Sequence, residues 1–226
     1  GEQQIPVVMI PGNHDSADRL GFGSRLLGEK LHIVSSLQRS IKPMTIEDEH
    51  GPIELFGLPF LEPARVREHT KDDDIRDHHA ATQAMVSKIC AERSTSRAVL
   101  VAHAFVQGGL VSESERPLSI GGLETVKANV FEPFDYVALG HLHRAQSVEH
   151  EHIQYSGSIL KYSSSEIDHN KAFTQIDMDA DGQCRIERIP IVAGRRLIRL
   201  EGHLEDLLDG DHAASPDDLI IARLLD

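Results

Sequence analysis

Histidine is the residue type that singles out this sequence. The 226-residue chain holds 14 histidines, and several of them stand directly after short apolar runs. Three runs share this arrangement: Val7–Ile10 before Gly12-Asn13-His14-Asp15, Ala98–Ala102 before His103, and Tyr136–Leu139 before Gly140-His141-Leu142-His143. Neutral imidazole nitrogen and amide oxygen bind divalent ions such as Mn²⁺, Fe²⁺ and Zn²⁺. Because ligands gather beyond the carboxyl ends of strands in α/β folds, these ends predict one shared metal site.

Two of these histidines have the spacing to act together. Residues i and i+2 of an extended stretch project to the same side, so His141 and His143 could reach one cluster. Gly140 permits a sharply turned backbone just before them. Each segment has a plainer interpretation when taken alone: a polar turn for residues 13–15, a buried core histidine for His103, and two surface histidines after Gly140. The coincidence of three strand ends favours the metal site.

The same His-x-His spacing recurs at His150-Glu151-His152 and serves as an internal control. It is flanked by Glu149, and no apolar strand leads into it. We therefore interpret this segment as a solvent-exposed edge turn and not as a metal site.

Bulk composition is that of an ordinary globular protein. Hydrophobic residues make up 40% and charged residues 26% of the chain, and the formal net charge is −13. Such an acidic balance is unlike that of a simple nucleic-acid-binding module, although bound cations can supply positive potential locally. No apolar run approaches the ~20 residues that cross a bilayer. The two distant cysteines, Cys90 and Cys184, favour a reducing compartment, and we expect a cytoplasmic location with no membrane partner.

The order of expected elements predicts an α/β core. Strands are expected at 5–10, 31–34, 41–46, 53–58, 98–102 and 136–139, and helices at 18–27 and 77–93, the latter with apolar residues at i, i+4 spacing. Later segments, at 153–155, 173–177 and 184–189, are mostly strands. A boundary is expected near Ala193-Gly194, followed by strands at 197–201 and 219–225 with a short helix at 203–208. Strand-helix alternation followed by strands is typical of a layered α/β domain and the opening of a second one.

At the three strand ends the chain resembles the last three signature motifs of the calcineurin-like metallophosphoesterases. The neighbouring segments are similar to the SbcD family of bacterial exonuclease subunits, whose counterpart works in double-strand-break repair. These segments are Ser112-Glu113-Ser114-Glu115-Arg116-Pro117 with Gly121-Gly122, Phe134–Leu139, and Tyr155-Ser156-Gly157-Ser158. The similarity runs over most of the chain.

This resemblance implies a two-metal phosphodiesterase site, with Mn²⁺ as the expected ion. The implied ligands of the second metal are Asn13, His103 and His141. His143 would be a ligand of the first metal. His14 would face the scissile phosphate as a general acid or charge stabiliser, with Asp15 to fix its orientation. The implied activity is Mn²⁺-dependent double-strand exonuclease and single-strand endonuclease action on DNA, by in-line attack between two metals in a repair and recombination complex.

The family's first two metal motifs do not stand ahead of these segments. Such enzymes begin with a strand ending in Asp-x-His and a second ending in Gly-Asp, whose carboxylate bridges both metals. The pair Gly210-Asp211 lies in the C-terminal part and follows no expected strand. We therefore expect an incomplete first-metal site. The 226-residue polypeptide is expected to bind at most one ion and to show no useful nuclease activity.

The implied fold is a four-layer α/β sandwich of two mixed β-sheets flanked by helices, incomplete at its N-terminus. Residues 1–193 would form the metallophosphoesterase (nuclease) domain, and 194–226 the beginning of a small α+β DNA-binding cap. The implied partners are DNA, a second copy of the chain in a homodimer, and an SbcC-type coiled-coil ATPase whose binding segment lies beyond the cap. Arg144, directly after His143, is the candidate for a DNA phosphate contact.

Two alternatives remain open on the sequence alone. The first is another calcineurin-like phosphodiesterase or phosphatase, acting on a small phosphodiester or a phosphoprotein. The second is a non-catalytic binding or structural fragment.

Overall fold

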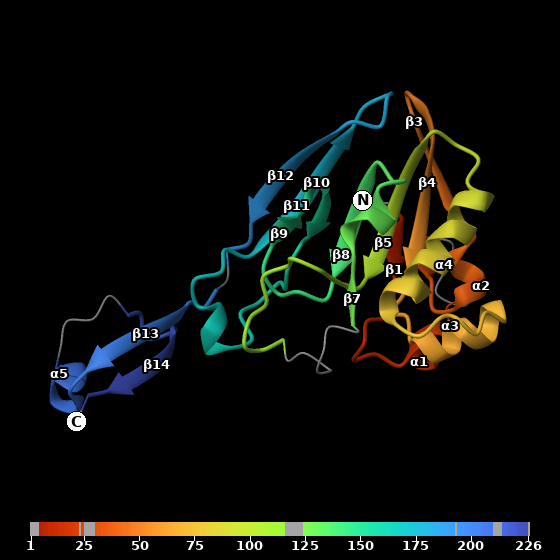
Figure 1. Ribbon diagram of the computed structural model, residues 1–226. Helices are drawn as coiled ribbons and strands as arrows, with labels where there is room; N and C mark the ends of the chain where they lie inside the picture. Colours follow the sequence, from red (N-terminus) through yellow and green to blue (C-terminus); the bar gives the residue numbers. More distant parts are fainter. Residues whose placement is uncertain are drawn as a thin grey trace.

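A six-stranded mixed sheet forms the centre of the computed structural model, which describes residues 5–22, 24, 30–115, 124–192, 194–209 and 214–225. The strand order is β3-β4-β5-β8-β10-β9 (Figure 1). Their bounds are β3 Met44–Asp48, β4 Gly51–Leu58, β5 Arg97–His103, β8 Tyr136–Gly140, β9 Gln146–Val148 and β10 His150–Tyr155. The four central strands run parallel, and the two edge strands run antiparallel to their neighbours.

Helix α4, His78–Glu92, supplies much of the core that covers this sheet. Its residues Ala81, Met85 and Ile89 are 0% exposed, at the i, i+4 spacing from which the helix was predicted. Asp77 caps its first turn by accepting a hydrogen bond from the N–H of Ala80 at 2.7 Å. The predicted helix at 77–93 is confirmed. Two shorter helices, α2 (Leu37–Ser40) and α3 (Pro63–Thr70), lie beside it (Figure 1).

The first part of the chain forms a small parallel pair, β1 (Val7–Met9) with β2 (Leu31–Ile33). The main chain joins it to the central sheet, because the N–H of Phe60 donates to the carbonyl of Pro11 at 3.1 Å. Gly57 on β4 permits this approach, since a Cβ there would stand 2.8 Å from Cβ of Val34. Helix α1 spans Ala17–Gly21, so the predicted helix at 18–27 ends early, and its residues 25–27 lie outside the described ranges.

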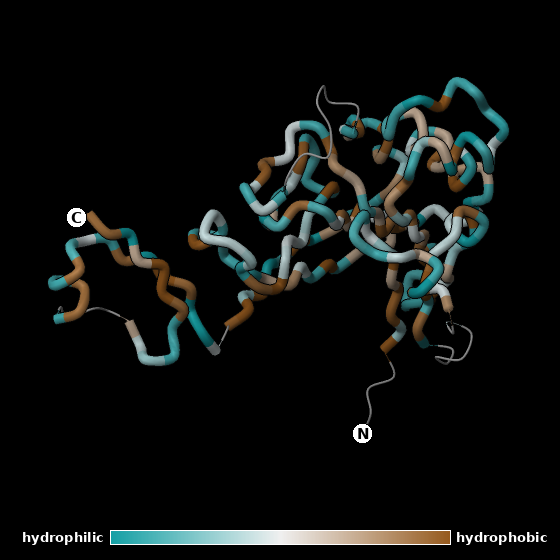
Figure 2. The backbone as a smooth tube through the Cα atoms, turned by 90° about the horizontal axis from the view of Figure 1, so that it is seen from below, coloured by the Kyte–Doolittle hydropathy of each residue, from teal (hydrophilic) through white to brown (hydrophobic). Residues whose placement is uncertain are grey.

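Two further strand pairs follow the central sheet: the antiparallel pair β11 (Ala172–Met178) and β12 (Cys184–Pro190), and the parallel pair β13 (Leu197–Gly202) and β14 (Leu219–Leu224). Helix α5, Leu204–Asp209, packs on the latter. Figure 1 places β13, β14 and α5 apart from the central sheet, and Figure 2 shows apolar stretches along them. Several of their side chains are exposed, among them Leu208, Leu219, Ile220 and Leu225.

The remaining short elements lie near the sheet's edges. Strands β6 (Phe105–Val106) and β7 (Thr125–Val126) form a parallel pair, and two 3₁₀ turns, η2 and η3, span Ala128–Phe131 and Ser164–Glu166. Among the described residues, no helix is long and apolar enough to cross a membrane.

The predicted α/β class with a mixed sheet and helices is confirmed. The described residues form one six-stranded sheet and four two-stranded pairs, so the division into two large sheets and four layers stays a prediction. One prediction was wrong: His150-Glu151-His152 is the first half of β10 and not a turn. It was missed because its polar residues carry no apolar alternation, whereas pairing with β9 and β8 supplies the backbone partners.

Candidate metal centre

Three chain segments that end strands meet at one rim of the fold. β5 ends at His103 and β8 ends at Gly140, and these two residues are direct partners in the parallel register. His141 therefore follows immediately beside His103. The turn after β1 reaches the same place, because Oδ1 of Asn13 lies 2.9 Å from Nε2 of His103. The structure thus brings together Asn13, His103 and His141, as the strand ends predicted.

Two glycines make room for the ring of His103. A Cβ on Gly12 would stand 2.6 Å from Cε1 of this ring, and a Cβ on Gly140 would stand 3.0 Å from its Nδ1. Real Cβ atoms essentially never approach so closely, so larger residues at these positions would displace the imidazole. The ring is held from the other directions by edge-on contacts, with centroids 5.4 Å from His141 and 6.1 Å from Phe60.

The donor atoms fit a single divalent ion. Two ligand atoms at right angles around an octahedral ion, each ~2.1 Å from it, lie about 3 Å from each other. The separation of 2.9 Å between Asn13 Oδ1 and His103 Nε2 matches this spacing. Within the described residues, no group of three or more His, Cys, Asp and Glu side chains is arranged to hold a metal ion. The set at this rim instead combines two imidazoles with an amide oxygen.

Burial keeps the two imidazoles in the form that metals bind. It lowers the pKa of His103 to about 4, and the nearby rings of His141 and His14 act in the same direction, against the carboxylate of Asp15. Burial also lowers the pKa of His141. Both rings are therefore neutral at pH 7 and need lose no proton before they bind a cation.

His14 and Asp15 occupy the exposed side of the first turn. His14 is near enough to lower the pKa values of His103 and His141. The carboxylate of Asp15 accepts a hydrogen bond from the N–H of Gly12 at 2.8 Å, so it closes the turn that presents Asn13. Among the bonds of the described residues, none joins Asp15 to the ring of His14; the orienting role expected for Asp15 stays a prediction.

The chain turns sharply at His141, whose φ of 119° is positive. Residues other than glycine rarely adopt such angles, and strain of this kind costs about 1–3 kcal/mol and gathers at functional sites. His141 and His143 are therefore not two positions of one extended stretch, as predicted from their spacing. His141 instead faces His103 and stacks on Phe105, with ring centroids 5.6 Å apart.

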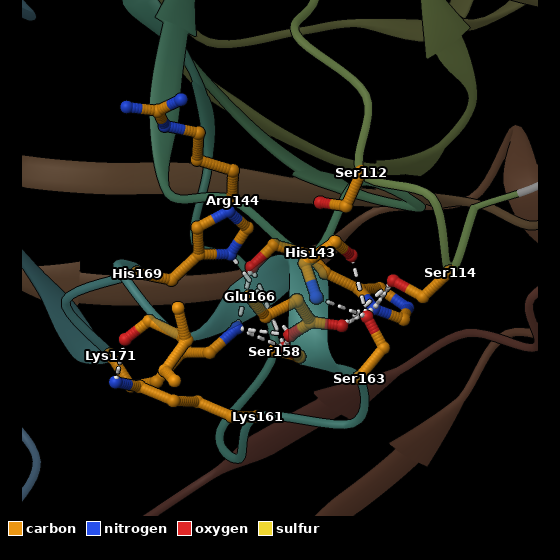
Figure 3. A network of polar contacts seen from close by, with 12 residues as sticks. Ser112, Ser114, His143, Arg144, Ser158, Lys161, Ser163, Glu166, His169 and Lys171 are labelled. Carbon is orange, nitrogen blue, oxygen red and sulfur yellow. Dashed lines mark hydrogen bonds and ion pairs between the residues drawn. The ribbon is translucent and has the colours of Figure 1, made fainter. Parts of the chain in front are cut away.

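His143 lies in a separate and charged setting (Figure 3). Its Nδ1 atom is 2.8 Å from Oε1 of Glu166, a residue that is 0% exposed. The other oxygen of Glu166 is 2.7 Å from Nζ of Lys171. The hydroxyl of Ser114 also donates to Oε1 of Glu166, at 2.8 Å. Burial acts to raise the pKa of Glu166, but the hydrogen bonds from Lys171, His143 and Ser114 outweigh it and lower this pKa to about 2.

Sequence reasoning missed this network. Its members are Ser114, Glu115, Ser158, Glu166 and Lys171, and the stretch Ser163–Ser165 before Glu166 gave no more than a loop pattern. The available indication was a Glu and a Lys five residues apart in a segment rich in serine, which is too common to identify a site. The rest of the predicted segment, residues 116–122, lies outside the described ranges.

Arg144 and two Asp-x-His triplets complete the comparison with the sequence predictions. Arg144 is exposed beside a groove that Lys171 and Arg188 also line. The letters Asp-x-His occur at Asp48-Glu49-His50 and Asp77-His78-His79. Asp48 is bound to Arg97 at 2.5 Å, and Asp77 caps α4, so both carboxylates have structural roles. Gly210-Asp211 lies outside the described residues.

Comparison with known proteins points to one kind of relative. No family model matches the chain. Over 92% of its length, the chain is 34% identical to the SbcD subunit of the nuclease SbcCD from Staphylococcus epidermidis and covers 55% of that protein. It is 38% identical to the protein of the same name from Staphylococcus saprophyticus, again over 92% of the chain and 54% of the relative. The chain thus spans about half the length of the curated relatives it matches.

Proposed function

We propose that this chain, which is related by sequence to the SbcD subunit of the nuclease SbcCD over nearly its whole length, carries part of a metal-dependent phosphodiesterase that cleaves DNA. One observation supports the chemistry most strongly: three loops from distant parts of the chain bring Asn13, His103 and His141 to one point. Three such donors on separate strand ends have no structural need of one another, whereas a divalent ion requires all three.

The proposed roles follow from the donors. Asn13, His103 and His141 would hold one divalent ion, and His143 would be a ligand of a second. Mn²⁺ is the proposed ion, because neutral imidazole and amide oxygen suit it. Divalent ions bound there would stabilise the negative charge that develops on a phosphodiester during in-line attack by water.

The chain's own residues would position the phosphate and move one proton. His14 is exposed beside the Asn13–His103–His141 cluster and would donate a proton to the leaving oxygen of the cleaved strand. Asp15 closes the turn that presents Asn13, so its contribution would be to hold the ligand in place. Arg144, exposed directly after His143, would contact a neighbouring phosphate of the DNA.

The finer features of the family are part of the proposal. They are exonuclease action on duplex DNA and endonuclease action on single strands, a coiled-coil ATPase partner of the SbcC type, a homodimer, a cytoplasmic location, a four-layer sandwich over 1–193 and a DNA-binding cap beginning at 194. The name of the relatives supports the ATPase partner, because it describes one subunit of a two-component nuclease. The donors grouped among the described residues are Asn13, His103 and His141, with no carboxylate bonded to them there, so the 226-residue chain is proposed to bind one ion and to cleave DNA poorly by itself.

Calorimetric titration with Mn²⁺ tests the central claim. We expect uptake of one ion per chain, and loss of at least about tenfold in affinity, about 1.4 kcal/mol, in His103→Ala and in Asn13→Ala. His150→Ala is the matched control, because it removes an imidazole of a second His-x-His pair at an exposed strand. No uptake by the unsubstituted chain, or equal losses in His150→Ala, would contradict the site.

An activity assay addresses the substrate class. Linear duplex DNA and a chromogenic phosphate monoester are supplied with Mn²⁺ to the same preparation. Hydrolysis of the monoester but not of DNA would favour a phosphatase over a nuclease. Robust DNA cleavage by the 226-residue chain would contradict its proposed dependence on a bridging carboxylate.

A further inference from the structure

Glu166 lies behind His143, outside the cluster of Asn13, His103 and His141. It ends the 3₁₀ turn η3, and its side chain is fully buried. A carboxylate removed from water is costly unless hydrogen bonds and an opposite charge compensate it. Both of its oxygens are satisfied here, Oε1 by the ring of His143 and Oε2 by the ammonium group of Lys171 (Figure 3).

Lys171 ties this carboxylate to the backbone of His143. Its Nζ atom donates to the carbonyl of His143 at 3.0 Å and to Oγ of Ser158 at 2.6 Å, in addition to Oε2 of Glu166 at 2.7 Å. The ammonium has three protons and uses them on three acceptors. The charge of Glu166 is therefore matched by a cation that cannot swing away without losing two further bonds.

An ionised carboxylate can only accept hydrogen bonds, and this determines the proton position on His143. Oε1 of Glu166 lies 2.8 Å from Nδ1 of the ring, so Nδ1 must carry the hydrogen. In a neutral imidazole the proton on Nδ1 leaves a lone pair on Nε2. A histidine held in this way presents Nε2 as its ligand atom, and such outer partners set ring orientation at metal sites.

The backbone of His143 is held from a second direction. The carboxylate of Glu115 accepts the N–H of His143, and the N–H of Ser158 donates to the carbonyl of His143 at 3.1 Å. Ring and main chain are thus both anchored, by residues from the segments on either side of β8 in sequence. A surface histidine needs no such enclosure.

We propose that Glu166 is the positioning residue of His143: its carboxylate keeps the proton on Nδ1 and fixes the ring plane, so that Nε2 is the atom offered to the ligand. The use of Nε2 rests on the proposed function. The proton position and the ring orientation do not, and they can be measured without any metal.

The variant Glu166→Gln inverts the bonding with little change of shape. Lys171 has only donors, so the amide oxygen of the glutamine must face Nζ, and the NH₂ group then faces Nδ1 of His143. Because Nδ1 must now accept, the proton is expected to move to Nε2. Glu54→Gln is the matched control, since Glu54 is also buried, at 3% exposure, and is bound by Ser94 and Thr95 and by no histidine.

Long-range ¹H–¹⁵N correlation spectra of the histidine rings in the metal-free chain report the tautomer. The signals of His143 are identified by their loss in His143→Gln. We expect Nδ1–H in the unsubstituted chain and in Glu54→Gln, and predominantly Nε2–H in Glu166→Gln. Nε2–H in the unsubstituted chain, or Nδ1–H retained in a folded Glu166→Gln, would overturn the proposal.

Two further outcomes are assigned in advance. If Glu166→Gln does not fold, the unsubstituted chain still decides, because Nδ1–H supports the proposal and an equal mixture of tautomers overturns it. If the chain takes up no Mn²⁺ but His143 carries Nδ1–H and switches in Glu166→Gln, the positioning role stands and only the metal assignment fails.

Discussion

His141 and His143 are two residues apart, yet their surroundings are opposite in character. His141 belongs to a neutral cluster, where Asn13, His103 and aromatic rings surround it and burial lowers its pKa. His143 belongs to a charged network with Glu166 and Lys171. A neutral cluster can take up a cation directly, whereas the charged network already contains its cation and uses it to hold a ring. The same short motif therefore carries two kinds of histidine.

The largest expected effect comes from breaking the charged network. Lys171→Met leaves the carboxylate of Glu166 buried without its cation, and removal of one partner of a buried pair costs about 3–5 kcal/mol of unfolding free energy. Denaturant unfolding followed by circular dichroism measures it. Arg223→Met is the control, because the Arg223–Glu201 pair has exposed side chains and contributes at most about 1 kcal/mol. Equal losses in the two variants would contradict the importance of burial.

The neutral cluster is expected to depend on space instead of charge. Gly12→Ala would place a Cβ 2.6 Å from Cε1 of His103, so the ring must shift. We expect a loss of about 1–3 kcal/mol in stability and weaker Mn²⁺ uptake in the same calorimetric titration. Gly194→Ala is the matched control, since no atom of the described residues would lie within 4 Å of a Cβ added there. Unchanged Mn²⁺ affinity in Gly12→Ala would show that the ring position is not critical.

Acid should weaken the fold through the neutral histidines. His103 has a native pKa of about 4 against an ordinary value of 6.5, so below pH 6.5 the unfolded chain binds its proton first. Its contribution to stability is complete above pH 6.5 and is lost as the pH falls toward 4, with a slope of at most about 1.4 kcal/mol per pH unit. The slope between these limits should be smaller in His103→Gln than in the unsubstituted chain. Equal slopes would contradict a neutral, buried His103.

The smallest effect concerns the surface beyond the two histidines. Arg144→Ala should lower the affinity for single-stranded DNA and reduce the slope of log affinity against log salt by about 0.7, the value for one phosphate contact. Fluorescence anisotropy at several salt concentrations measures this slope. Arg185→Ala, an exposed position on β12, is the control. An unchanged slope in Arg144→Ala would remove this residue from the proposed DNA contacts.

Local sequence was enough to predict the central strands and the main helix. β5 and β8 are short apolar runs, and α4 has apolar residues at helical spacing behind the capping Asp77, so pattern and burial agree there. Helix α3 was missed because only Val66 among its residues is buried, which leaves almost no apolar period. Its Pro63 at the first turn was the one available indication. The first half of β10 was missed for a similar reason, since polar residues there are held by their neighbours.

The sequence by itself determined the meeting of Asn13, His103 and His141, because parallel strands bring their carboxyl ends to one rim and each donor directly follows an apolar run. Only the tertiary structure decided that His143 belongs to Glu166 and Lys171. That choice depends on a loop and a turn from two distant segments closing around one ring. Burial then made a Glu–Lys pair into the ring's support, and burial of a charged pair is a property of the packed fold that no local pattern of letters records.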